Sequence, residues 1–169
     1  MKKVTEIKIP LDSLLAHSLS RIDFGDAYQA NLSNAALTPT ELFLLASKAT
    51  PGWVNALMQV RNTLVRKLGL KDVGAFGDAP AKPAEAYRIG DRLGIFHIMA
   101  MTENELVMGI DDSHLDVRVS VLKASRNGLN SYVVSTAVKV HNWLGHVYML
   151  PVGRIHPLVV KAMMRRAAV

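Results

Sequence analysis

The densest group of chemically versatile side chains in this sequence lies between Asp111 and Arg118. Successive side chains of an extended strand point to opposite faces, so residues two apart share a face. Carboxylates and an imidazole at that spacing could hold a divalent ion, and a neighbouring Asp/His pair could transfer protons. The candidate residues on this face are Asp112, His114, Asp116 and Arg118.

The same residues also have a structural interpretation, which we favour. Period-two spacing turns them away from the valines that must face the core, so we expect them to lie on the solvated face of an edge or convex strand. Asp116 and Arg118 would then act mainly as an ion pair. No second imidazole stands near His114 in the sequence. We therefore expect no metal at His114.

Three further histidines are candidates. His97 interrupts an apolar strand pattern, so it is either a polar group in an apolar cavity or a residue of the outer face, and the two are equally well supported. His141 follows the last expected strand, and His156 precedes a proline in the final helix. Either could meet Asp112 in space, but histidines that bind backbone groups at the ends of elements are the favoured alternative.

Methionine occurs 8 times, and several of these residues fall on neighbouring expected strands and on the final helix. Soft, unbranched side chains suit adaptable apolar sites, although ordinary core filling is the favoured explanation. If a ligand cavity exists between the sheet and the last helix, we expect it to be lined by His97, Met99, Met101, Met108, Thr136 and Met163.

Composition excludes several classes of protein. The 169 residues contain no cysteine, which rules out disulfide scaffolds, thiolate metal sites and cysteine nucleophiles and fits a reducing cytoplasm. A hydrophobic content of 50% with 20% charged residues is typical of a globular chain, and the length fits one domain over 1–169. No nucleophile elbow, P-loop or His-Glu-x-x-His motif occurs, which weakens hydrolase, nucleotidase and zincin interpretations. We predict no cofactor.

The sequence also lacks membrane and export signals. Charges within residues 4–10 interrupt the stretch where a signal peptide would be apolar. No apolar run approaches the roughly 20 residues that a membrane span needs. We therefore expect a cytoplasmic protein without a membrane span.

The formal net charge is +6, and the excess lies toward the C-terminal ends of two expected helices. Cations there interact favourably with the helix dipole, by about 0.3–1 kcal/mol each, so a nucleic-acid partner is not expected. The alternative is an anionic partner such as phosphate, nucleic acid or an acidic membrane surface. The basic residues are Arg61, Arg66, Lys67 and Lys71, and Arg154, Lys161, Arg165 and Arg166.

Hydrophobic periodicity and turn signals then give the elements that must position these residues. Residues 1–20 form an N-terminal extension, strand-like over 4–9 and helical over 11–17, without an assigned role. Thr38, Pro39 and Glu41 form a helix start with a capping box. Residues 74–86 form a surface loop. The remaining expectations are strands at 24–32, 93–101, 106–111, 115–124 and 131–141, and helices at 39–49, 53–68 and 145–166, the last kinked or broken at its prolines.

This order indicates an α+β fold. Short links between the later strands favour antiparallel neighbours, so we predict a curved antiparallel sheet of at least five strands packed against the long C-terminal helix. Two shorter helices would close one end and leave a cavity between sheet and helix. The expected core residues are Trp53, Leu57, Leu64, Val117, Val119, Val134 and Val138.

Several blocks of the sequence together form a recognisable pattern. They are 53–58 with Arg61 and Asn62, 68–71, 109–121, 140–142 with Leu144 and Gly145, and 148–152 before His156. From about Ile22 to the C-terminus, this pattern resembles a bacterial family, the domain of unknown function 2867. That family is similar to the START-like, or SRPBCC, helix-grip superfamily, whose members commonly bind hydrophobic small molecules and include some cyclases. The resemblance implies a helix-grip fold, and it carries over no activity and no catalytic residues.

Three functions follow from these patterns. The leading hypothesis is a protein that binds a hydrophobic small molecule in a cavity between the sheet and the C-terminal helix. The alternative is a small enzyme of cyclase or isomerase type that uses His and Asp residues near that cavity. The third is an interaction module that uses the basic helix ends.

Overall fold

The centre of the structure is an antiparallel sheet of seven strands. The computed structural model describes residues 3–67, 82–126 and 128–167, the side chains at 64, 65, 67 and 126 excepted. The strands are β1 (Val4–Ile7), β2 (Phe24–Asn31), β3 (Arg92–Leu93), β4 (Phe96–Met101), β5 (Glu105–Asp111), β6 (Leu115–Arg126) and β7 (Leu129–Val140). Their order in the sheet, β1-β2-β7-β6-β5-β4-β3, makes β6 and β7 central and confirms the predicted antiparallel neighbours.

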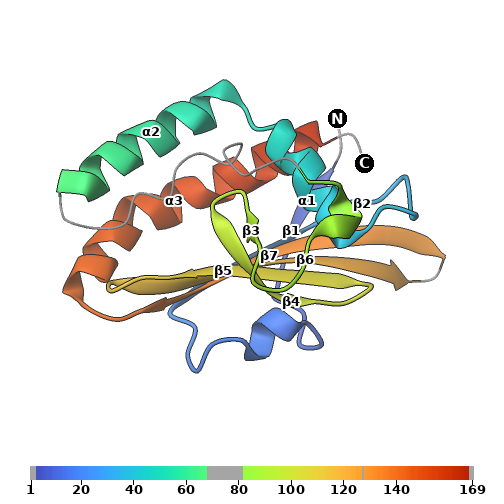
Figure 1. Ribbon diagram of the computed structural model, residues 1–169, viewed down its shortest axis with the longest axis horizontal. Helices are drawn as coiled ribbons and strands as arrows, with labels where there is room; N and C mark the ends of the chain where they lie inside the picture. Colours follow the sequence, from blue (N-terminus) through green and yellow to red (C-terminus); the bar gives the residue numbers. More distant parts are fainter. Residues whose placement is uncertain (1–2, 68–81, 127, 168–169) are drawn as a thin grey trace.

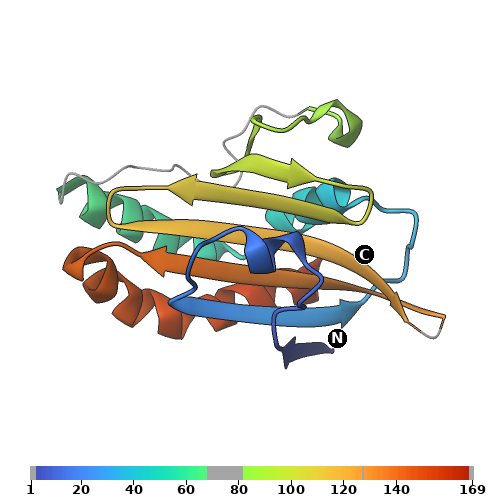
Figure 2. The ribbon, with the colours of Figure 1, turned by 90° about the horizontal axis from the view of Figure 1, so that it is seen from below.

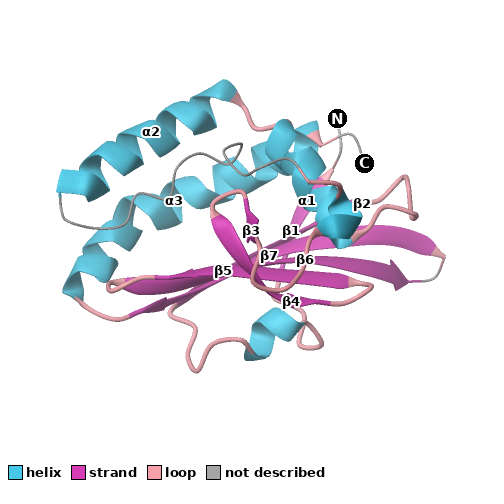
Figure 3. Ribbon diagram, viewed as in Figure 1, coloured by secondary structure: helices cyan, strands magenta, loops and turns pink. Residues whose placement is uncertain are grey.

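Helices cover one face of the sheet (Figures 1 and 3). These are α1 (Pro39–Lys48), α2 (Gly52–Lys67) and α3 (Trp143–Arg166), while the short 3-10 helix η1 (Leu14–His17) lies on the opposite face (Figure 2). A second short 3-10 helix, η2 (Ala84–Ala86), falls in the expected loop 74–86, of which residues 74–81 lie outside the described residues. The predicted α+β class, with a C-terminal helix on an antiparallel sheet, is confirmed.

Strand register decides which side chains face the helices. Two neighbouring rows cross the middle of the sheet on the helix side, and the second ends in polar residues. The first row is Ile110, Val117, Val138 and Phe24, and the second is Met108, Val119, Thr136 and Asp26. Of the predicted core valines on these strands, Val138 is buried, whereas Val117, Val119 and Val134 are partly buried and pack against the main core.

Helix α1 begins as the sequence predicts. The Thr38 hydroxyl accepts a hydrogen bond from the Glu41 backbone N–H at 3.2 Å, and the Glu41 carboxylate accepts one from the Thr38 backbone N–H at 2.7 Å. This reciprocal capping box satisfies two backbone donors that the helix start would otherwise leave open. The helix then places Leu42 and Phe43 in the main core.

Helix α3 is longer and more continuous than predicted. It runs for 24 residues with Pro151 and Pro157 inside it, so the expected kink or break does not interrupt the helix. Each proline removes one backbone donor and crowds the preceding turn, which costs stability unless packing compensates. Here the helix is held to the sheet near its C-terminal end by Met164, which lies in the main core, and its start is capped by Asn142.

The spacing of Trp53, Leu57 and Val60 predicts an apolar stripe on α2, and the expected burial of these three residues is wrong. Trp53 is 45% exposed, Leu57 37% and Val60 58%, although the first two were expected in the core. The side chain of Leu64, the remaining expected core residue of this helix, lies outside the described residues. The apolar stripe of α2 therefore faces solvent, contrary to the usual arrangement of an amphipathic helix.

The inward face of α2 is partly polar. Val54 is buried at its start, and Asn62, one of the polar residues of the helix, is buried near its end. Arg61 is partly buried because its side chain bonds to Tyr148 of α3. The correction has a physical reason: α2 packs through polar partners on this side, which the spacing of its apolar residues does not show.

The sheet face opposite the helices is closed by the N-terminal segment. Glu105 of β5 is buried there, and its carboxylate accepts hydrogen bonds from the hydroxyls of Ser13 and Ser120, each at 2.5 Å, and from the Leu14 backbone N–H at 2.8 Å. Three donors offset the cost of burying a carboxylate. The extension to which the sequence assigned no role is thus tied to the sheet beside η1.

The start of α3 lies directly on the turn between β5 and β6. A Cβ atom at Gly145 would stand 2.3 Å from the backbone oxygen of His114 and 2.8 Å from Cγ1 of Val140. No side chain fits at such distances without a shift of the backbone. Glycine at 145 therefore permits the close contact between the helix and the turn.

We expect Gly145→Ala to lower the free energy of unfolding by about 1–3 kcal/mol, because its methyl group must displace backbone. Gly153→Ala is the matched control, since the nearest atom to its new methyl would lie 3.5 Å away. Helix propensity should leave that variant unchanged or up to about 1 kcal/mol more stable. Urea unfolding followed by circular dichroism measures both, and equal effects would contradict the close contact.

Candidate functional site

Four apolar side chains on the helix side of the sheet keep part of their surface exposed. They are Ile110, Val117, Val119 and Val134, which we call the apolar patch. Helix α2 lies over β5 and β6 in Figure 2, and Figure 1 shows it farther from the sheet than α3. The helices therefore do not fully cover this apolar part of the sheet.

A buried histidine lies close to the apolar patch, in the turn between β5 and β6. His114 is 1% exposed, and its ring meets the ring of Tyr148 edge-on with centroids 5.3 Å apart. Neither of its ring nitrogens has a hydrogen-bond partner among the described residues. Asp112 Oδ2 lies 3.5 Å from Nδ1 and is itself buried without a hydrogen bond there. Such unpaired buried polar atoms are uncommon and call for a functional or structural explanation.

Tyr148 connects this histidine to α2 and to the apolar patch. Its hydroxyl accepts a hydrogen bond from Arg61 Nε at 3.1 Å, and Arg61 Nη1 donates to Asn62 Oδ1 at 2.9 Å. The tyrosine also packs against the same small apolar cluster as Val117. Helix α2, the turn between β5 and β6, and helix α3 thus meet at one place. We call the polar side chains that they bring together the polar cluster: Arg61, Asn62, Asp112, His114 and Tyr148.

The polar cluster keeps its histidine uncharged at neutral pH. Burial is the largest cause and lowers the pKa of His114 below its ordinary value of 6.5. The Asp112 carboxylate acts in the opposite direction, and the charge of Arg61, followed by an electrostatic effect of the nearby His141, lowers the pKa of His114 further. A neutral imidazole offers one donor and one acceptor nitrogen, which suits it to bind a polar ligand or to move a proton.

The expected surface pair of Asp116 with Arg118 does not form. Arg118 Nη1 bonds to Asp111 Oδ1 at 2.6 Å, and Asp116 Oδ1 lies 2.9 Å from His141 Nε2. The expectation that His114 shares their solvated face is also wrong. The physical reason is that Asp112 and His114 lie in the turn before β6 begins, where strand alternation does not apply.

A second polar group, the His156 group, lies on the same side of the sheet. His156 Nδ1 is 2.9 Å from Asp26 Oδ2, and its Nε2 is 3.4 Å from the Thr136 hydroxyl. Asp26 also accepts a hydrogen bond from the Tyr28 hydroxyl at 3.1 Å, while its other oxygen is buried without a partner among the described residues. Burial, with the Asp26 charge as the next cause, raises the pKa of Tyr28. The carboxylate orients the imidazole, so Nε2 can act as a proton acceptor.

The structure separates the six expected cavity residues. His97 is exposed, and both it and Met99 lie on the face away from the helices, because Ile98 between them faces the core. A chain turn at Gly94 and a bulge between Ile98 and Ala100 break the single alternation that the sequence suggested. Of the other four, Met108 lies in the main core, Met101 packs against it, Thr136 joins the His156 group, and Met163 is partly buried on α3.

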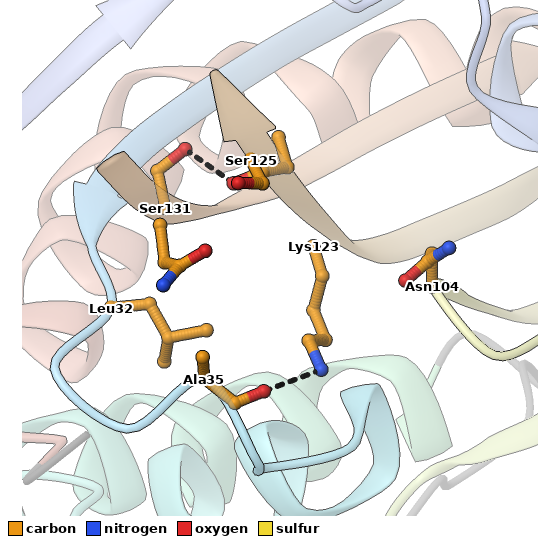
Figure 4. Close-up of a pocket in the computed structure, with 8 residues that line it drawn as sticks. Leu32, Ala35, Asn104, Lys123, Ser125 and Ser131 are labelled. Carbon is orange, nitrogen blue, oxygen red and sulfur yellow. Dashed lines mark hydrogen bonds between the residues drawn. The ribbon is translucent and has the colours of Figure 1, made fainter. Parts of the chain in front are cut away.

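Two small pockets open elsewhere on the described surface. One, of about 180 Å³, lies where the β6–β7 hairpin meets the loop after β2 (Figure 4). There the Lys123 ammonium donates to the backbone oxygen of Ala35 at 2.9 Å, and five of the eight lining residues have polar side chains. The other, of about 280 Å³, lies beside the start of α1. Both are below the usual range of small-molecule sites, roughly 300–1,000 Å³, and neither includes the polar cluster.

Metal and membrane interpretations gain no support. Within the part of the chain that the structure describes, no three His, Asp or Glu side chains come together as a set of metal ligands. Among the helices described, none combines the length and apolar character needed to cross a bilayer.

Comparison with protein families shows to which family this chain is related. The model of a family described as a protein of unknown function, DUF2867, matches residues 18–163. The chain belongs to this family. No curated protein matches the sequence. The DUF2867 match spans β2 to α3, so it includes every residue of the polar cluster and of the His156 group.

Sequence reasoning missed Arg61, Asn62, Tyr148 and Asp26 as site residues. The sequence did contain a signal for the first two. One face of α2 carries residues at helical spacing that include both of them, namely Val54, Met58, Arg61 and Asn62. No local pattern marks Tyr148 or Asp26, whose roles depend on how α3 crosses the sheet. His141 and His156 were both considered as partners of Asp112, but they pair with Asp116 and Asp26 instead.

The lowered pKa of His114 predicts a pH-dependent stability. As the pH falls from about 7.5 to 5.5, the unfolded chain takes up a proton at His114 that the folded protein does not, so the free energy of unfolding decreases. Replacing His114 by Gln should reduce this decrease, by at most about 1.4 kcal/mol per pH unit. Urea unfolding at several pH values measures the effect, with the exposed His17→Gln as control. A pH dependence identical to that of the unaltered protein would contradict the assignment.

Proposed function

We propose that this DUF2867 protein binds a small, largely apolar molecule between the sheet and the α2–α3 layer. The observation that carries the proposal is the inverted orientation of α2, which exposes Trp53 and Val60 while Arg61 and Asn62 turn inward. An amphipathic helix normally turns its apolar side inward, and sequences depart from this rule mainly at functional sites. Polar side chains that face inward in place of apolar ones are suited to orient a ligand.

The apolar patch supplies the complementary surface. Ile110 and Val117 are cross-strand partners, and Val117 shares a small apolar cluster with Tyr148 of the polar cluster. A ligand that extends from Tyr148 along this row would remove partly exposed apolar surface from water, at roughly 25 cal/mol per Å². The combination of an apolar surface with a few convergent polar groups is typical of small-molecule sites.

Fold and setting form part of the same proposal. A curved antiparallel sheet with a long C-terminal helix supports a START-like, helix-grip domain over 1–169, and the absence of cysteine supports a cytoplasmic location. The interaction module that uses basic helix ends has less support. Arg61 turns inward, Lys161 pairs with Glu6 at 3.2 Å, and Arg154 bonds to the backbone of its own helix.

A neutral fluorescent probe tests the binding function. N-phenylnaphthylamine is expected to bind saturably, with increased fluorescence, and Val119→Phe is expected to weaken this binding at least about fivefold by filling the apolar patch. Val147→Phe is the matched control, because Val147 is 52% exposed on α3. Absence of saturable binding to the unaltered protein, or equal binding by both variants, would overturn the proposal. Urea unfolding confirms that both variants are folded.

A second candidate function is an enzyme of isomerase type, and the His156 group favours it. Asp26 orients the ring so that Nε2 faces the same layer as the apolar patch, since Thr136 and Val119 are cross-strand partners. A positioned imidazole that removes a proton beside a carbonyl group typically contributes a factor of 10²–10⁴ in rate. The structural alternative is that these hydrogen bonds only fix α3 to the sheet.

Deuterium exchange separates these two roles of His156. For the enzyme, the protein should accelerate exchange of the acidic C–H hydrogens of 2-tetralone in D₂O, and His156→Gln should remove at least about nine-tenths of that acceleration. The exposed His97→Gln should leave it unchanged. No acceleration by the unaltered protein, with a loss of stability in His156→Gln, would assign the group to structure.

A further inference from the structure

One partly buried arginine, on α2, has no acidic partner among the residues that the structure describes. Arg61 points inward from α2, and its hydrogen bonds go to the Tyr148 hydroxyl and to the Asn62 side-chain oxygen. Among the described residues it forms no ion pair, whereas Arg21, Lys82, Arg118 and Lys161 each do. A guanidinium has five N–H donors in a planar fork, so most of its capacity is left for another acceptor.

The neighbouring groups also present donors. The Tyr148 hydroxyl uses its oxygen to accept from Arg61, which leaves its own hydrogen free to donate. His114, next to Tyr148, is 1% exposed, and both of its ring nitrogens lack hydrogen-bond partners among the described residues. A guanidinium, a phenol and an imidazole therefore meet at one place, where the described residues supply no carboxylate to Arg61 or to the Tyr148 hydroxyl.

Asp112 does not fill this role. Its Oδ1 accepts from the backbone N–H of Ser113 at 2.7 Å, and its Oδ2 lies 3.5 Å from His114 on the side of the turn. The structure gives no contact between this carboxylate and Arg61. The contacts of Asp112 are thus with the turn and with His114, and no carboxylate among the described residues pairs with the Arg61 guanidinium.

We infer that the ligand of this site is an amphipathic carboxylic acid whose carboxylate binds Arg61 and the Tyr148 hydroxyl. This inference rests on the proposed function and names the class of its ligand. The carboxylate accepts two N–H bonds from the guanidinium, the geometry that arginine matches best, and a third from the phenol. The hydrocarbon part then lies on Val117 and Ile110, which continue from Tyr148 across the sheet.

Decanoate and decan-1-ol share a hydrocarbon chain and differ in charge, so they test the head group. Displacement of N-phenylnaphthylamine should show decanoate binding at least about tenfold more tightly than decanol. Arg61→Met should abolish that preference, and Tyr148→Phe should reduce it about three- to tenfold. Arg61→Lys keeps the charge without the planar fork and should restore only part of it.

Arg66→Met is the matched control, because Arg66 lies on the same helix and is exposed. It should leave both affinities unchanged, and thermal unfolding identifies any variant that fails to fold. Equal affinities for acid and alcohol, or equal losses of both in Arg61→Met, would overturn the inference while leaving the binding function intact. If the probe does not bind saturably to the unaltered protein, the proposed function itself fails.

Discussion

The contact between the first turn of α3 and the carbonyl oxygen of His114 determines the geometry of the helix side of the sheet. Gly145 allows the helix to lie on this turn without an intervening side chain. From there α3 crosses the sheet in a fixed direction. It brings Tyr148 to the ring of His114 within its first turns and His156 to Asp26 farther along. Both polar groups thus depend on one backbone contact.

The two groups differ in how well their hydrogen bonds are satisfied. In the His156 group the imidazole has a partner on each nitrogen, which is the arrangement expected where a helix is fastened to a sheet. In the polar cluster the imidazole has none, and the adjacent arginine lacks a carboxylate among the described residues. Buried polar groups are costly when unpaired. This difference is the reason to propose ligand recognition at the polar cluster and to treat His156 as a candidate for proton transfer.

The fold could be predicted from patterns among neighbouring residues. The site could not, because it depends on contacts between residues that are far apart in the sequence. The capping box at Thr38 and the alternation of Val117 and Val119 depend on neighbouring residues, so they were predictable. The inward turn of Arg61 was not, because a helix orients by its best partner and that partner, Tyr148, is 87 positions away. The burial of His114 was not predicted for a related reason, because the alternation of strand side chains was applied to residues that lie in a turn.

The sheet ends on both sides in strands that are poor templates for further pairing. β3 has 2 residues and β1 has 4, and β1 is flanked by Lys3 and Lys8 and followed by Pro10. Short edges, lysine and proline are the usual protection against edge-to-edge association of sheets. Growth of the sheet by strand addition, and with it the first step toward fibrous aggregates, is therefore disfavoured at each margin, even though the central hairpin of β6 and β7 is long and rich in β-branched residues.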